Sequence, residues 1–263
     1  MTETKEQTKD ANKLDFQSRI KFRCHPGVKC FTNCCSDVTI FLTPYDVLRL
    51  KNRLGLASAQ FMEKHTLLLN REQQVIPLVV LKMSDNERKT CPFVTAEGCT
   101  VYEDRPWACR MFPLDVDEKE MFSVIASPQK CLGLLEDAEM RVIEWLEDQG
   151  VMDYQRVNNY YSEITSHPKM NELEITNERI RQMVYLAAYN LDKFREFVLD
   201  GRFFQMFEFD DDLEERVRVD DTELLKLGLD WIKFGLFGQK TLKLKAEVLE
   251  AHKRAKAAAP KAG

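Results

Sequence analysis

The sequence predicts a helix-dominated α+β protein in which a loop-rich cysteine-cluster module packs on a C-terminal helical region. Three observations support this fold class. All eight cysteines lie in the first half of the chain, and residues 132–263 contain none. Proline and glycine interrupt the cysteine-rich half at short intervals, which is typical of loops. From Leu134 onward, apolar residues recur instead at helical spacing.

Length and composition indicate a folded chain without a strong preference for polyanions. With 263 residues, of which 44% are hydrophobic, the chain has enough apolar material for one large or two modest domains. The net charge of −5 argues against nucleic acid and against an anionic membrane as main partners. No apolar run approaches the roughly 20 residues of a membrane-spanning helix, and the first residues lack the apolar core of a secretion signal. We therefore expect a cytoplasmic protein.

Changes in composition divide the chain into four predicted regions. These are a flexible charged leader (1–20), a cysteine-cluster metal-binding domain (21–133), a helical region (134–239) and a basic, frayed tail (240–263). Within the helical region, residues 208–223 hold nine acids and two arginines, which is typical of a solvated loop or helix face.

Local patterns predict several elements. Residues 36–42 are β-branched and apolar, and we expect a short strand there. Thr43, Pro44 and Asp46 are typical of a helix N-terminus, and Gly55 is typical of a helix end. Apolar runs or periodicity predict four further elements: a helix from Ser58, a strand over 75–83, a helix between 134 and 150, and a helix over 177–199.

The cysteines predict a metal centre rather than disulfides. Eight cysteines in a chain without a secretion signal fit a reducing compartment, and their segregation is unlike scattered buried thiols. The first set has the spacing C-x5-C-x3-C-C and the second C-x7-C-x9-C-x21-C. Neither contains the C-x2-C knuckle of zinc ribbons and fingers. Thiolates at irregular spacings on loops suit a polynuclear centre, so we favour an iron–sulfur cluster, [4Fe–4S], with zinc as the alternative.

Two details of the cysteine pattern bear on ligation. The side chains of the adjacent Cys34 and Cys35 diverge, so either the two serve different metals or only one is a ligand. Pro106 is expected to begin a short helix that places Cys109 in its first turn beside Arg110, where the thiolate is favoured. Four thiolates on a [4Fe–4S] core leave a charge of about −2, which Arg105 and Arg110 would offset while donating hydrogen bonds to sulfur.

The segment CPFVTAEGCTVYEDRPWACRMFP, over residues 91–113, carries a family resemblance. Together with the first cysteines and Cys131, it resembles the YkgJ-type cysteine-cluster proteins, the CxxCxxCC family of zinc- or iron-chelating domains, over about residues 22–132. The first spacings are wider than the motif that names the family. Flagellin lysine N-methylases look like relatives that share the cluster, but no S-adenosylmethionine loop is recognisable here.

The resemblance implies a metal-binding set and its supports. The implied ligands are Cys24, Cys30, Cys34, Cys35, Cys91, Cys99, Cys109 and Cys131, and the implied supporting residues are Tyr102, Arg105, Pro106 and Arg110. His25, beside Cys24, and His65 are weaker candidate ligands.

Three functions fit these predictions, and we favour the first. It is a cytoplasmic protein whose iron–sulfur or zinc centre has a structural or redox role. The second is a metal-dependent enzyme that modifies a protein or peptide partner, for instance by methyl transfer, and it predicts a polar pocket beside the cluster. The third is a metal chaperone or storage protein with exchangeable metal. The sequence leaves open whether there is catalysis.

Overall fold

A computed structural model describes residues 13–69, 76–172 and 178–258 of the chain. Helices account for 51% and strands for 14%, so the prediction of a helix-dominated α+β protein is confirmed. Within the described residues, the strands form five sheets of two antiparallel strands each. Among the helices described, none combines the length and the apolar character that crossing a bilayer requires.

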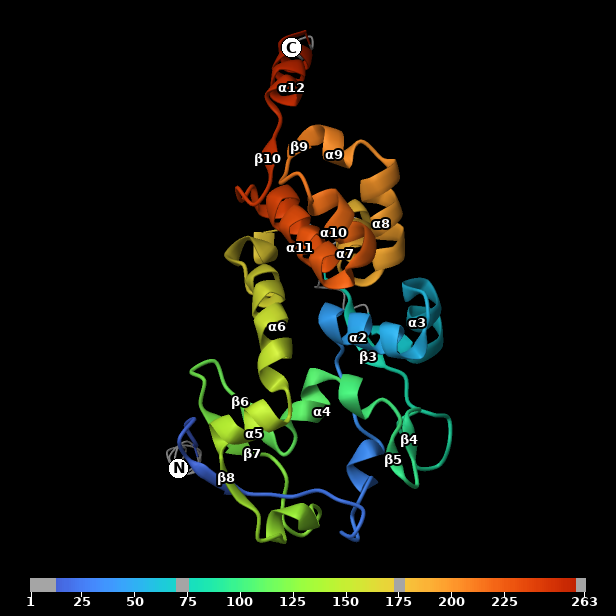
Figure 1. Cartoon of the computed structure of the whole chain (residues 1–263), viewed down its shortest axis with the longest axis vertical. Helices are drawn as coiled ribbons and strands as arrows, with labels where there is room; N and C mark the ends of the chain where they lie inside the picture. Colours follow the sequence, from blue (N-terminus) through green and yellow to red (C-terminus); the bar gives the residue numbers. More distant parts are fainter. Residues whose placement is uncertain (1–12, 70–75, 173–177, 259–263) are drawn as a thin grey trace. The chain divides into compact units, whose positions relative to one another are not determined.

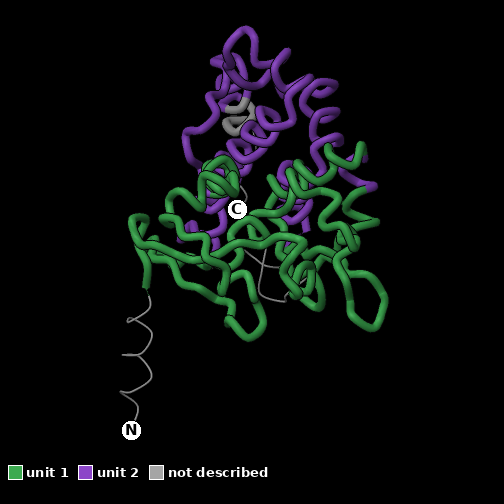
Figure 2. The backbone as a smooth tube through the Cα atoms, turned by 60° about the horizontal axis from the view of Figure 1, so that its bottom comes forward, with its two compact units in different colours: residues 1–55, 61–69, 78–158 green, residues 56–60, 70–77, 159–263 purple. Residues whose placement is uncertain are grey.

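The chain, whose elements are labelled in Figure 1, divides into two compact units, which Figure 2 shows in green and purple. The first comprises residues 1–55, 61–69 and 78–158, and the second comprises residues 56–60, 70–77 and 159–263. Two helices, α3 (Ser58–His65) and α6 (Val151–Thr165), contribute residues to both units.

The first unit is built from short elements separated by loops (Figure 1). Besides its parts of α3 and α6, its elements in chain order are β1 (Arg19–Lys21), η1 (Asn33–Cys35), α2 (Pro44–Leu54), β2 (Thr66–Leu69), β3 (Leu78–Leu81), β4 (Val94–Thr95), β5 (Gly98–Cys99), η2 (Tyr102–Asp104), α4 (Trp107–Met111), β6 (Leu114–Val116), β7 (Phe122–Val124), η3 (Leu132–Leu135), β8 (Glu139–Arg141) and α5 (Val142–Asp148). The sheet pairs are β1–β8, β2–β3, β4–β5 and β6–β7. None of these sheets is large enough to hold the loops by itself.

Helix α2 begins and ends at the residues that the sequence predicts. The carboxylate of Asp46 accepts hydrogen bonds from the Thr43 backbone N–H at 2.8 Å and from the Thr43 hydroxyl at 2.9 Å. In return, the Thr43 hydroxyl accepts from the Asp46 N–H at 3.2 Å, which completes a capping box. Gly55, with a φ of 64°, ends the helix in the left-handed conformation.

The predicted helix between residues 134 and 150 is only partly correct. Residues 139–141 form strand β8, in which Arg141 lies opposite Arg19 of β1, and helix α5 begins at Val142. Asp137, within the predicted helix, instead pairs with Lys21 of β1 at 2.8 Å. The helix begins only at Val142 because residues 139–141 pair with strand β1, which is distant in the sequence. Local periodicity cannot reveal such a partner.

The predicted strand over residues 36–42 is not formed. Two isolated bridges, Ser36 with Thr90 and Phe41 with Val80, replace it. The predicted strand over 75–83 is confirmed at β3, whereas Val75 lies outside the described residues. The helix predicted from Ser58 is confirmed as α3.

The second unit is mainly helical. Besides its parts of α3 and α6, its elements are η4 (Pro168–Glu172), α7 (Glu178–Tyr189), α8 (Leu191–Asp200), α9 (Phe203–Met206), β9 (Phe207–Glu208), α10 (Leu213–Val219), α11 (Asp221–Phe237), β10 (Lys243–Leu244) and α12 (Ala246–Ala258). The helix predicted over 177–199 is two helices, because the backbone of Asn190 is not helical, with φ −108° and ψ 65°. Residue 177 lies outside the described residues.

Helix α11 organises this second unit. The Asp220 carboxylate caps it by accepting from the Thr222 N–H at 2.7 Å and the Glu223 N–H at 3.2 Å. Lys233 of α11 is 1% exposed, and its Nζ lies 2.6 Å from Glu163 Oε2. The same Nζ lies 3.2 Å from the centre of the Tyr160 ring. These contacts join the last turns of α6 to α11 by an ion pair and a cation–π interaction.

We expect Lys233→Ala to lower the free energy of unfolding by about 2–4 kcal/mol, because it leaves a cavity and removes a buried cation from its partners. The measurement is urea denaturation followed by circular dichroism. Lys226→Ala, on the same helix, is the control. That lysine is 53% exposed and pairs with Glu223 at 2.7 Å, so its loss should cost less than about 1 kcal/mol. Equal losses for the two variants would contradict the role given to Lys233.

Candidate metal centre

All eight cysteines lie in the first unit, and all eight thiols are free. Cys24 and Cys34 are exposed and the other six are half-buried. Cys34 and Cys35 end η1, Cys99 ends β5, Cys109 lies in α4 and Cys131 directly precedes η3. Cys24, Cys30 and Cys91 lie on loops. The first unit therefore brings together thiols from two stretches that are distant in the sequence, 24–35 and 91–131.

Two backbone contacts bring the start of the first stretch to the end of the second. The Leu132 N–H donates to the Sγ of Cys30 at 3.2 Å. The Arg23 N–H donates to the Gly133 carbonyl at 3.0 Å, and a Cβ on Gly133 would lie 2.7 Å from the Arg23 carbonyl oxygen. Only glycine allows this close approach, so residues on either side of Cys24 and Cys131 are held next to one another.

The thiols in this neighbourhood act on one another electrostatically. Burial raises the pKa of Cys24 to about 11, with further contributions from Cys34, Cys30 and Cys131. Burial also raises the pKa of Cys131, and Cys30 and Cys34 add to the effect. These four thiols therefore lie within Coulombic range of one another.

A second neighbourhood forms around Cys91. Its backbone N–H donates to the Cys35 carbonyl at 2.7 Å, and Val94, which donates to the Cys91 carbonyl at 3.2 Å, lies opposite Cys99 in the β4–β5 pair. Burial raises the pKa of Cys109 to about 12, with Cys91 and Cys99 adding to the effect. Cys35, Cys91, Cys99 and Cys109 therefore lie in one neighbourhood of the first unit.

Cys34 and Cys35 connect the two neighbourhoods. The Cys35 thiol donates a hydrogen bond to the Cys34 sulfur, which lowers the pKa of Cys34 to about 7 and raises the pKa of Cys35. Cys91 and Cys109 also raise the pKa of Cys35. Cys35 therefore lies close to the second neighbourhood, and Cys34 to the first.

Across residues 13–69, 76–172 and 178–258, no three His, Cys, Asp or Glu side chains already converge closely enough to hold one metal ion. The thiols lie in one unit but do not surround a common ion position. They lie on loops and short elements, and binding of one ion by three or more of them would require them to move closer together. As a donor set, thiolates match the soft metals Zn²⁺ and iron.

Two polar features beside the thiols suit an anionic metal–thiolate centre. The Ser36 hydroxyl, next to Cys35, is buried and has no hydrogen-bond partner. Arg105 is 7% exposed, and its charge favours the thiolate forms of Cys99 and Cys109, since it lowers their pKa against the larger effect of burial. A buried cation is costly without a counter-charge, which a thiolate-ligated metal would supply.

Arg110 fixes the helix that carries Cys109. It is 6% exposed, and it donates from Nε to the Arg105 carbonyl at 3.0 Å and from Nη1 to the Gln149 carbonyl at 2.7 Å. Its guanidinium lies 4.3 Å from the centre of the Tyr154 ring. Arg105 donates to the Tyr102 carbonyl at 2.6 Å and to Gln149 Oε1 at 2.7 Å. Both arginines thus donate to oxygen atoms here, and their role at a metal centre stays a prediction.

Asp46 is a part of the site that the sequence analysis assigned only to the start of α2. It is 1% exposed, and its Oδ1 accepts from the Trp107 N–H at 2.8 Å, which ties α2 to the first turn of α4. Burial raises its pKa to about 6. Pro106 is the N-cap residue of α4 and not its first helical residue. The five-residue helix is therefore held in place by tertiary contacts to Asp46 and Arg110.

The segment that contains these thiols matches a known family. Residues 23–132 match the family described as “CxxCxxCC: Putative zinc- or iron-chelating domain”. We refer to this matched part of the chain, residues 23–132, as the CxxCxxCC domain. No curated protein and no solved structure matches the chain. The family description agrees with the predicted chelation of zinc or iron, and the relation to flagellin lysine N-methylases stays a prediction.

The weaker candidate ligands of the CxxCxxCC domain already have partners. His25 Nε2 lies 3.2 Å from Glu136 Oε2, and its Nδ1 accepts from the Gly27 N–H at 3.1 Å. The His65 ring lies between the rings of Phe61 and Phe93, at 5.4 and 5.2 Å between centres. Tyr102 is 51% exposed, and the Arg105 guanidinium lies 3.8 Å from the centre of its ring.

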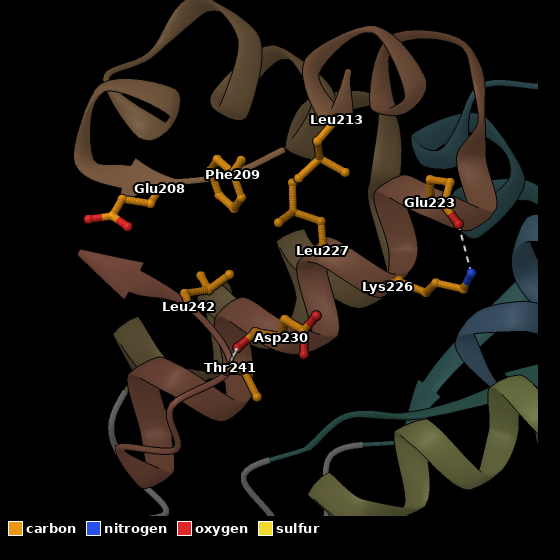
Figure 3. Close-up of a pocket in the computed structure, with 9 residues that line it drawn as sticks. All are labelled: Glu208, Phe209, Leu213, Glu223, Lys226, Leu227, Asp230, Thr241 and Leu242. Carbon is orange, nitrogen blue, oxygen red and sulfur yellow. Dashed lines mark hydrogen bonds and ion pairs between the residues drawn. The ribbon is translucent and has the colours of Figure 1, made fainter. Parts of the chain in front are cut away.

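A cavity of about 220 Å³ lies in the second unit, apart from the CxxCxxCC domain in sequence (Figure 3). It is lined by Glu208, Phe209, Leu213, Glu223, Lys226, Leu227, Asp230, Thr241 and Leu242. Its acidic groups have partners within the unit: Lys226 pairs with Glu223 at 2.7 Å, and Lys243 pairs with Glu208 at 2.5 Å. The Tyr160 hydroxyl donates to Asp230. The acidic stretch 208–223 is thus largely paired with neighbouring cations.

We expect Arg110→Ala to lower the free energy of unfolding by about 2–4 kcal/mol, because it leaves buried carbonyl groups without donors. The free energy of unfolding of Arg110→Lys should fall between those of the wild type and Arg110→Ala, since an ammonium keeps the charge but not the planar set of donors. Arg156→Ala is the control, because that arginine is 78% exposed and makes only an i,i+3 pair with Asp153. Urea denaturation measures all three. An Arg110→Ala variant as stable as the parent would contradict the anchoring role.

Proposed function

We propose that the CxxCxxCC domain holds a thiolate-ligated iron–sulfur centre, [4Fe–4S] in preference to zinc, with a structural or redox role. The observation that carries this proposal is that eight free thiols, from two stretches distant in the sequence, lie within one compact unit. Eight free thiols persist in a reducing compartment, so we place the protein in the cytoplasm.

The architecture of the domain supports a structural contribution from the metal. The β4–β5 sheet, which carries Cys99, pairs only two residues on each side. Such a sheet gives little stability of its own, and metal bound to the loops would supply folding free energy in its place. The candidate ligands are the eight cysteines, four of which would hold one [4Fe–4S] core, while Arg105 would offset its negative charge. When bound, an iron–sulfur centre would also supply one-electron transfer.

The preference for iron over zinc rests on the ligand pattern. Structural zinc sites draw their ligands from short knuckles, which this chain lacks. A cluster with several irons accepts thiolates that approach from several directions, as these loops and short elements present them. Half-burial of most of the thiols also limits access of water and oxygen to the centre.

Metal analysis and an electronic spectrum of protein purified without oxygen test this function. We expect brown protein with broad charge-transfer absorption in the visible range and with iron and sulfide bound. Colourless protein with stoichiometric zinc would refute the iron–sulfur centre and retain the chelating domain. Folded protein without any bound metal, also after reconstitution with iron and sulfide or with zinc, would refute the proposed function as a whole.

A further inference from the structure

We infer that the eight cysteines form two separate four-thiolate centres and that the boundary between them passes between Cys34 and Cys35. This inference rests on the proposed function and specifies its ligand sets. The outer centre comprises Cys24, Cys30, Cys34 and Cys131. The inner centre comprises Cys35, Cys91, Cys99 and Cys109.

The outer centre is defined by the contacts between residues 22–34 and residues 131–138. The Leu132 N–H donates a hydrogen bond to the Cys30 sulfur, with 3.2 Å between nitrogen and sulfur. This contact places the Cys30 thiol beside Cys131, the residue before Leu132. The backbone bonds of Phe22 to Ala138 and of Arg23 to Gly133, each 3.0 Å long, bring the chain before Cys24 to the same segment. The N–H on sulfur is also the kind of hydrogen bond that stabilises a metal-bound thiolate.

The inner centre is defined by a different set of contacts. The Cys91 N–H on the Cys35 carbonyl and the bridge from Ser36 to Thr90 bring the end of η1 to the loop of Cys91. The β4–β5 pairing returns Cys99 to the same loop. Cys109 reaches it from α4, whose first turn is held by Asp46. Cys91 and Cys99 act electrostatically on the Cys109 thiol, which supports this placement.

Cys34 and Cys35 lie next to each other and interact, so we divide them by the segment that the backbone on either side of the pair contacts. On one side, the Asn33 N–H donates to the Cys30 carbonyl at 2.9 Å, which keeps the turn before Cys34 beside Cys30. On the other side, the Cys35 carbonyl accepts from the Cys91 N–H at 2.7 Å. The sequence left two choices for this pair: ligands to different metals, or a single ligand. The contacts favour ligands to different metals, and this assigns four thiolates to each centre, as tetrahedral zinc or a [4Fe–4S] cluster requires.

The surroundings of the two centres differ, and so should their exchange of metal with the solvent. Cys24 and Cys34 of the outer centre are exposed. All four thiols of the inner centre are instead half-buried, and the Ser36 hydroxyl next to Cys35 is buried. We therefore assign slow exchange and the larger stabilising effect to the inner centre, and fast exchange to the outer one.

The test measures bound metal per chain and its release to a chelator. The wild-type protein, loaded with zinc or reconstituted with iron and sulfide, should release metal in two phases of similar amplitude. Cys30→Ser should lose about half of the metal and the fast phase, and Cys99→Ser should lose about half and the slow phase. The variant with both changes should lose nearly all of it.

A matched pair of double variants separates two centres from one. Cys24→Ser with Cys30→Ser removes two ligands of one proposed centre and should lose no more metal than Cys30→Ser alone. Cys30→Ser with Cys99→Ser removes one ligand from each and should lose about twice as much. Loss of all metal from each single variant, or release from the wild type in one phase, would overturn the division while leaving the proposed function in place. Wild-type protein without metal would instead overturn the proposed function itself.

Should Cys99→Ser fail to fold, Cys30→Ser and the release kinetics of the wild type still decide the question. The outer variant Cys30→Ser should remain folded. Its melting temperature should lie closer to that of the wild type than the melting temperatures of the inner variants Cys91→Ser and Cys99→Ser do. An outer variant that keeps all of its metal would exclude Cys30 as a ligand and overturn the proposed outer set.

Discussion

The first unit depends on a few backbone hydrogen bonds that connect two distant cysteine-bearing stretches. The Cys91 N–H donates to the Cys35 carbonyl at 2.7 Å, and the Leu132 N–H donates to the Cys30 sulfur at 3.2 Å. These hydrogen bonds hold distant segments together, as the strand pairs of an extensive sheet do in other folds. The sheets here are too small for that purpose, so the thiol-bearing loops are positioned by isolated contacts. Metal chelation by the same loops would add cross-links where the hydrogen-bonded framework is thinnest.

A set of buried polar groups extends this framework to Cys109. Asp46 closes the first turn of α2 and accepts from the Trp107 N–H, while Arg110 binds carbonyl groups on both sides of α4. Because α4 has only five residues, it has little stability of its own. Gly150, with a φ of 64°, leaves the space that Arg110 occupies, since a Cβ there would lie 2.9 Å from Nη1. The contacts of Asp46 and Arg110 thus hold both helix α4 and the candidate ligand Cys109 in place.

Much of the fold was predictable where the signal is local. The Thr43–Asp46 capping box and Gly55 delimit α2, and Ser58 begins α3 as expected. Errors arose where a distant partner overrides local pattern. Residues 139–141 pair with β1 and do not begin a helix, and two single bridges replace the strand over 36–42. The break at Asn190 between α7 and α8 likewise has no signal in the apolar periodicity.

The sequence by itself determined the fold class, the helix ends marked by capping residues, and the likeness of residues 23–132 to a family described as zinc- or iron-chelating. These follow from composition, spacing and residues close in the chain. Only the tertiary structure decided which thiols are neighbours, that Asp46 also holds α4, and that both arginines donate to oxygen atoms. The physical reason is chain separation. Residues such as Cys30 and Leu132 meet through the folding of the whole unit, and no periodicity or spacing in the sequence records that contact.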